Sequence, residues 1–199
     1  MKQTILIYIL SIFGFVFVVC ADAFFLDTPE LFEKQQWSVG LALNARIPEY
    51  TAPIVFAQVG TKIPMDIQLK SGYQIAQYTN NKPYIGLESR FSILNDLGGA
   101  DILTMTLGGH YRNVPGIDAG INVGNTYTMQ HGNTLGFYTG VDCDIEFEQT
   151  ALRVPGVLII GMQHTINKQF RLTEEVSIPI IEDSYYGLGI AVSYIKQVH

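Results

Sequence analysis

Carboxylate, guanidinium and imidazole side chains recur at every second residue in several segments of the sequence. Asp142, Asp144 and Glu146 alternate with apolar residues, and Glu88 and Arg90 follow the same spacing. Opposite charges on one face of a segment can form ion pairs, a row of carboxylates can line a path for cations, and a histidine beside carboxylates can act in acid–base catalysis. The candidate residues for such chemistry are Glu88, Arg90, His110, Asp142, Asp144, Glu146, Arg171 and Glu175.

No short motif assigns a cofactor to these residues. The sequence contains no glycine-rich phosphate loop, no zinc motif and no calcium loop. Removal of the N-terminal segment would leave Cys143 as the one cysteine, which excludes a disulfide within the chain and CxxC chemistry. A lone histidine beside carboxylates is more often part of a structural ion pair than a catalytic base. The sequence therefore predicts no metal, no cofactor and no assigned catalytic residue.

The elements that carry these residues have the two-residue period of β-strands. Large apolar residues alternate with small or polar ones, whereas a helix would scatter the apolar residues over both faces. Turn signals rich in Gly, Pro and Asn separate the segments. The clearest strands are expected at 37–47, 85–93, 103–111, 117–127, 135–147 and 186–194.

Four further segments are expected, of which 66–78, 153–165 and 169–181 are less regular. The apolar face changes near Gly72, which predicts a bulge in 66–78, and Glu174 falls on the apolar face of 169–181. The segments 53–60 and 153–165 complete the set. Single-chain bacterial outer-membrane barrels use even numbers of strands, so ten strands are favoured and eight are the alternative.

The two faces of the strands differ in composition, and the difference indicates which face contacts lipid and which faces the lumen. One stripe is large, apolar and aromatic, and the other carries glycine, small polar residues and the charges. A membrane barrel places the first toward lipid and the second toward its lumen, and it must be closed because lipid cannot satisfy a sheet edge. Rings near the stripe ends fit an interfacial girdle: Trp37, Tyr84, Tyr111, Tyr127, Phe147, Phe170, Tyr186 and Tyr194.

In its strand pattern and its final strand, the chain resembles the small bacterial outer-membrane β-barrel proteins, the OmpA-, OmpX- and OmpW-like class. The resemblance is architectural and covers about residues 36–197. Gly189, Val192 and Tyr194 are similar to the assembly signal that such proteins present to the barrel-insertion machinery. The resemblance implies a Gram-negative outer membrane, with its lipid and lipopolysaccharide, as the surroundings. The chain departs from the family in ending five residues after Tyr194 and in having short predicted outer connections.

The N-terminal residues predict export. Lys2, an apolar run over 5–19 and the small-x-small sequence Ala21-Asp22-Ala23 are typical of a secretory signal peptide. We therefore expect a signal peptide at 1–23, a periplasmic segment with a short helix at 24–35, and the barrel at 36–199. Net charge of −6 and the lack of basic runs argue against nucleic acid as a partner.

Three functional hypotheses remain open at this point. An outer-membrane barrel with a structural role or a narrow passive pore for small solutes or ions is favoured. The alternative is a soluble periplasmic or secreted β-barrel that binds an apolar ligand. The third is a lipid A-modifying enzyme or protease, which is the least favoured, because no serine neighbours His110 on its strand and His164-Thr165-Ile166 lacks a His-x-Ser arrangement.

Overall fold

The computed structural model describes residues 32, 35–47, 50–76, 80–95, 101–112, 114–129, 131, 133–147, 152–181 and 184–197. The predicted signal peptide lies outside these ranges, and of the predicted short helix in 24–35 only Phe32 and Gln35 are described. Among the described residues, no helix is long and apolar enough to cross a membrane. The strands are β1 (Gln36–Ile47), β2 (Tyr50–Gly60), β3 (Met65–Ala76), β4 (Lys82–Asn95), β5 (Asp101–Tyr111), β6 (Pro115–Thr128), β7 (Thr134–Phe147), β8 (Leu152–Arg153), β9 (Gly156–Ile166), β10 (Phe170–Pro179) and β11 (Tyr186–Gln197).

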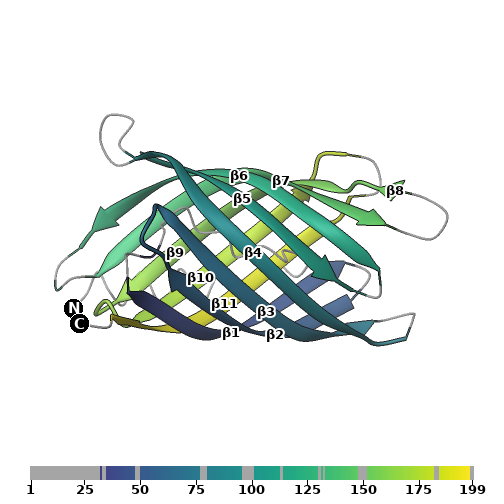
Figure 1. Ribbon diagram of the computed structural model, residues 1–199, viewed down its shortest axis with the longest axis horizontal. Coiled ribbons are helices and arrows are strands. Elements are labelled where there is room, and N and C mark those ends of the chain that lie inside the picture. The colour runs from purple at the N-terminus through teal and green to yellow at the C-terminus, as the bar shows by residue number, and fades with distance from the viewer. Residues whose placement is uncertain are drawn as a thin grey trace.

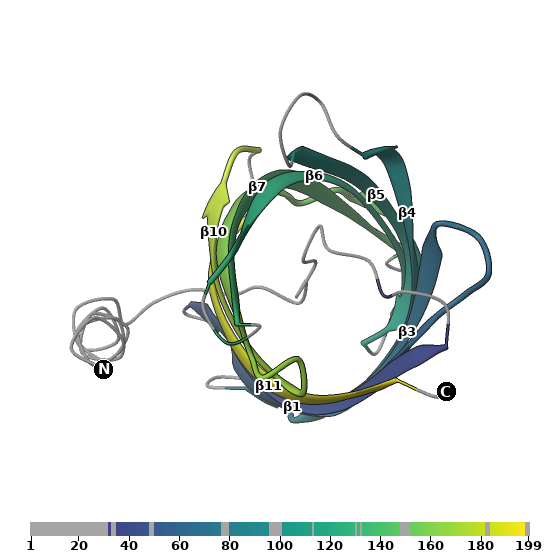
Figure 2. The same cartoon turned by 90° about the vertical axis from the view of Figure 1, so that its left-hand side faces the viewer.

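The strands close into a barrel. Each long strand pairs antiparallel with its neighbour in the chain, β1 pairs with β11, and the β6–β7 pairing completes the ring. Viewed along its length, the sheet encloses a central space (Figure 2). The two-residue β8 only extends the ladder at the end of β7, so the barrel has ten strands. The prediction of a closed antiparallel barrel with ten strands is confirmed.

The strand directions define two ends of the barrel. We call the end where β1 begins and β11 ends the proximal end, and Gln36 pairs there with Gln197. The turns β2–β3, β4–β5, β6–β7 and β9–β10 lie at this end, and the other connections lie at the distal end (Figure 1).

The register differs from the sequence prediction at one place. The predicted bulge near Gly72 is wrong, because β3 keeps a constant register with β2 and β4 and its inward side chains alternate without a break. The apparent change of face comes from Ser71, a polar residue on the outer face. The irregularity lies in β4 instead, between Ser92 and Leu94, where the register with β5 shifts.

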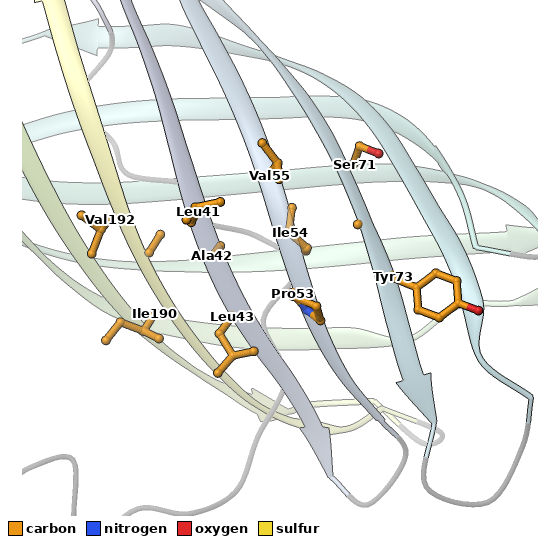
Figure 3. Close-up of a pocket in the computed structure, with 12 residues that line it drawn as sticks. Leu41, Ala42, Leu43, Pro53, Ile54, Val55, Ser71, Tyr73, Ile190 and Val192 are labelled. Atoms are coloured by element: carbon orange, nitrogen blue, oxygen red, sulfur yellow. The ribbon is translucent and has the colours of Figure 1, made fainter.

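The outer face of the barrel is apolar around its circumference. Large side chains from each long strand, such as Leu41, Leu87 and Ile121, are about half exposed on it. A shallow apolar depression in this face lies over β11, β1, β2 and β3, bordered by Leu41, Val55 and Val192 (Figure 3). An apolar outer face on a closed barrel is the arrangement of a membrane-spanning barrel.

Aromatic rings mark both borders of the apolar face. At the proximal end, Tyr194 packs edge to face against Phe170 and Trp37, with centroid distances of 5.5 and 6.5 Å. Tyr111 and Tyr186 are exposed near the distal end. Such rings prefer the level of lipid headgroups, so the two girdles bracket the membrane-spanning part.

Tyr84 is an exception to the predicted girdle. It is buried with the inward side chains of β4, and its ring stacks on His110 at a centroid distance of 6.2 Å. By the alternation of β4, Pro83 and Ile85 face outward and Tyr84 faces inward.

Glu174 lies on the lipid-facing side of β10, opposite Met162 and Ile190. We expect Glu174→Leu to stabilise the folded barrel by about 1–2 kcal/mol, because it removes a carboxylate from an apolar surface. Urea titration of the protein in lipid vesicles, followed by the fluorescence of Trp37, measures the change. Ser177→Leu, which places the same side chain inside the barrel, should destabilise it; a destabilising Glu174→Leu would contradict the assignment of the faces.

Candidate functional site: the charged lumen

The proximal part of the lumen is built around a buried ion pair. Arg90 donates two hydrogen bonds to the carboxylate of Asp66, from Nε at 2.8 Å and from a terminal nitrogen at 2.6 Å. The Gln58 amide donates to the same carboxylate at 2.7 Å. Asp66 and Arg90 face each other across β3 and β4, so the strand register brings them together. A paired guanidinium and carboxylate satisfy each other where water is excluded.

Phe32, which precedes β1, lies in this part of the lumen. Its backbone N–H donates to Asp66 at 3.2 Å, and its ring lies under the guanidinium of Arg171 at 4.8 Å. The ring is buried. A residue that precedes the first strand therefore fills space between the proximal ion pair and the opposite wall.

A second group of contacts lies midway along the lumen, between side chains on nearby strands. Lys70 donates to Glu88 at 2.7 Å, and both side chains are fully buried. On the opposite wall, the Tyr138 hydroxyl donates to Glu175. The Tyr138 ring occupies the space over Gly161, where a Cβ atom would collide with it. Large side chains on one strand are thus accommodated by glycines on the next.

The distal end contains a cluster of titratable groups, which we call the distal cluster: His110, Arg112, Asp118, Asp144 and Glu146. The His110 ring lies 2.9 Å from Asp118 through Nδ1 and 3.6 Å from Asp144 through Nε2. The Arg112 guanidinium contacts the Asp144 carboxylate and lies 3.1 Å from Glu146. All five side chains are buried.

Glycine on β6 makes the distal cluster possible. Across the sheet, His110 is opposite Gly116, and Gly116 is opposite Glu146. A Cβ at position 116 would collide with the His110 ring and would lie 3.2 Å from Asp144 Oδ1. Because position 116 has no side chain, groups from β5 and β7, two strands apart, meet above it.

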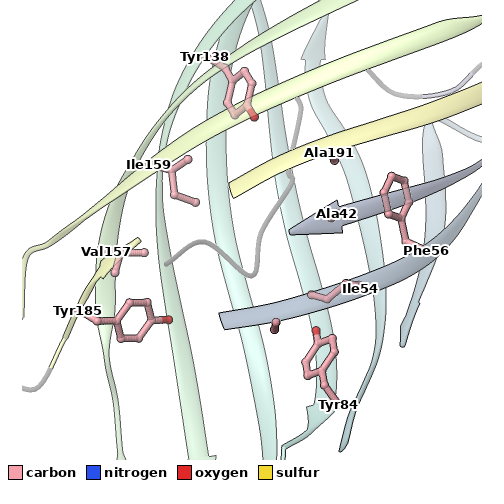
Figure 4. Packing of buried hydrophobic residues seen from close by; sticks show 10 residues of the cluster. Ala42, Ile54, Phe56, Tyr84, Tyr138, Val157, Ile159, Tyr185 and Ala191 are labelled. Atoms are coloured by element: carbon pink, nitrogen blue, oxygen red, sulfur yellow. The ribbon is translucent and has the colours of Figure 1, made fainter. Parts of the chain in front are cut away.

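Aromatic and cationic side chains complete the distal end. The Arg46 guanidinium lies 3.4 Å from the Tyr185 ring centroid and 5.8 Å from that of Tyr50. Arg112 reaches the Tyr50 hydroxyl at 3.5 Å. Figure 4 shows the Tyr84, Tyr138 and Tyr185 rings among the buried side chains. These side chains occupy space inside the barrel that would be open to water in a wide pore.

The eight charged candidates from the sequence all lie on the inner face, and each is at most 7% exposed. The structure brings His110, Asp144 and Glu146 together, and it gives each of Glu88, Arg90 and Glu175 a partner on another strand. Asp142 accepts a hydrogen bond from the backbone N–H of the next residue at 3.0 Å. Of the assembly-signal residues, Gly189 faces inward, while Val192 and Tyr194 face outward.

Sequence reasoning missed several of the partners. Asp66 and Lys70 lie in the segment whose alternation Ser71 obscures. Arg112 follows the last residue of β5. Asp118 stands alone among small residues, and only its alternation with apolar neighbours on β6 could have pointed to the lumen.

The arrangement limits the chemistry available in the lumen. A His–Asp pair such as His110 and Asp118 can exchange protons in an enzyme. Here the side chains of both residues are at most 2% exposed, so a substrate as large as a peptide or a lipid headgroup has no access to them in this conformation. Buried charges that pair with one another are typical of structural ion pairs.

Comparisons with known proteins bear only on the barrel architecture. No family model and no curated protein matches the chain. Solved structures that it resembles include the N-terminal β-barrel domain of Pseudomonas aeruginosa OprF (6% identity, 82% of this chain and 98% of that one, TM-score 0.40) and the KdgM porin (10% identity, 81% and 99%, TM-score 0.42). A designed transmembrane β-barrel is similar at 11% identity, over 84% and 100%, with a TM-score of 0.40. At these scores the likeness is one of barrel architecture, and it carries no argument about function.

Proposed function

We propose that the protein is an outer-membrane β-barrel with a structural role, whose lumen is closed by its own paired side chains. The observation that carries this proposal is the contrast between the faces: apolar side chains are exposed outside, and charged side chains are buried and paired inside. A wide water-filled pore would leave its inward charges accessible to water.

The alternatives fit these observations less well. A soluble barrel that binds an apolar ligand needs its large apolar residues inside, and here Leu41, Val55 and Leu87 are outside. A narrow passive pore needs a continuous wet path, whereas Arg90 and Lys70 are among the largest fully buried side chains of the lumen. The enzyme hypothesis would rely on the His110–Asp118 pair, whose side chains are buried.

The proposed partners follow from the location. Lipid and lipopolysaccharide would contact the apolar face, and the aromatic rings around Tyr194 would lie at the proximal, periplasmic border. The barrel-insertion machinery would act on the final strand, through Gly189, Val192 and Tyr194. The signal peptide at 1–23 would supply export to that machinery.

The location is tested by fractionation of bacteria that express the full chain. We expect the protein in the outer-membrane fraction after a carbonate wash, with faster migration on SDS gels when the sample is not boiled, because closed barrels resist SDS. A protein recovered in the soluble periplasmic fraction, or one with no heat-dependent change in migration, would contradict the proposal.

A further inference from the structure

We propose that the distal cluster binds one divalent metal ion of the zinc class through His110, Asp144 and Glu146. One ligand atom of each residue lies within 4.8 Å of the other two. One imidazole nitrogen and two carboxylate oxygens are donors that zinc accepts, with a fourth position left for water. No short sequence motif predicts this site, because its ligands come from β5 and β7, which are far apart in the sequence.

The orientation of His110 supports metal binding. Nδ1 lies 2.9 and 3.0 Å from the two oxygens of Asp118, so the Nδ1–H group donates to that carboxylate. In the neutral ring with its proton on Nδ1, the lone pair of Nε2 is directed toward Asp144. A carboxylate that holds one ring nitrogen while the other faces a metal is the usual arrangement around histidine ligands.

The distance between His110 and Asp144 also fits two ligands of one ion. Nε2 is buried and makes no hydrogen bond to the described residues, and Asp144 Oδ1 is 3.6 Å away. That separation is too long for a hydrogen bond. Two ligand atoms that each lie about 2.1 Å from a tetrahedral zinc ion are about 3.4 Å apart. Gly116 keeps this gap free of a side chain.

Arg112 is the built-in competitor for the site. Its guanidinium pairs with both Asp144 and Glu146 in this structure. A bound ion would take over that role, and Arg112 also contacts the Tyr50 hydroxyl on the same rim. Removal of the guanidinium should therefore raise the affinity for the metal, whereas removal of a structural cation alone would only destabilise the cluster.

The test is titration of the purified, chelator-treated protein in detergent with Zn²⁺ alone, by calorimetry and by metal analysis after dialysis. We expect one ion per chain and tighter binding by Arg112→Gln. Asp118→Asn should weaken binding by about 10–100-fold, and His110→Ala should abolish it. His131→Ala, which changes an exposed histidine of the proximal turn, is the matched control and should leave binding unchanged.

Gly116→Ala provides a variant that keeps every ligand and fills the gap between them. It should lose zinc binding while its heat-dependent gel migration remains that of a folded barrel. The proposal is overturned if neither the wild type nor Arg112→Gln binds zinc, or if a folded His110→Ala or Gly116→Ala variant binds as the wild type does. These outcomes do not depend on whether the lumen conducts ions, so they are distinguishable from a failure of the proposed function.

Discussion

Replacement of Asp66 by alanine will destabilise the folded barrel by about 3–5 kcal/mol, because it leaves the Arg90 guanidinium buried without its carboxylate. Asp66 also accepts hydrogen bonds from Gln58 and from the backbone of Phe32, so four donor groups on three residues lose their acceptor together. Urea titration in lipid vesicles measures the loss. Trp37, the one tryptophan of the chain, reports unfolding from the outer face of β1.

Two variants make this result specific to the ion pair. The double variant Asp66→Leu/Arg90→Met should recover most of the stability, because apolar residues of similar volume can replace a buried ion pair. Lys62→Ala, which removes an exposed charge from the neighbouring β2–β3 turn, should change stability by less than about 0.5 kcal/mol. A loss below about 1 kcal/mol for Asp66→Ala would mean that the proximal pair is hydrated, and the filled lumen would then be in doubt.

Removal of the large charged side chains from the lumen will turn the barrel into a channel. Lys70→Ser/Glu88→Ser removes both members of one buried pair, and adding Asp66→Ser/Arg90→Ser removes the next one toward the proximal end. Water can then occupy the volume of these side chains, and ions can follow it. We expect single-channel steps in planar bilayers that grow from the double to the quadruple variant.

The folded state of the channel variants is checked by gel migration, and Glu174→Leu serves as the control that alters only the outer face. Conductance steps by Glu174→Leu would show that the current does not come from the lumen. Silence of a folded quadruple variant would show that other groups close the lumen, and the Lys70 and Arg90 pairs would lose the role assigned to them.

The barrel itself could be predicted from the sequence because the alternation that defines each strand lies within a short segment. Alternation along 135–147 or 186–194 fixes which residues share a face, and lipid outside with charges inside explains the composition of both faces. Ten strands follow from counting such segments. The prediction failed at Gly72 because Ser71, a polar residue on the outer face, changes the apparent phase of the strand.

The contacts in the lumen could not be predicted in the same way. They depend on the register between strands and on which positions lack a side chain. His110 and Glu146 lie close together because the residue between them on β6, Gly116, has no side chain. Arg90 pairs with Asp66 because the register of β3 and β4 places these two residues opposite each other. A slip of two residues would keep every face and change every partner.

The measurement that tests the closed lumen most directly is the current through the wild-type protein in a planar lipid bilayer. The purified, heat-modifiable barrel should insert without resolved single-channel steps, because paired side chains of Asp66, Arg90, Lys70 and Glu88 fill its lumen. Regular steps of uniform size from the wild type, absent in protein-free bilayers, would contradict this account and favour a narrow passive pore.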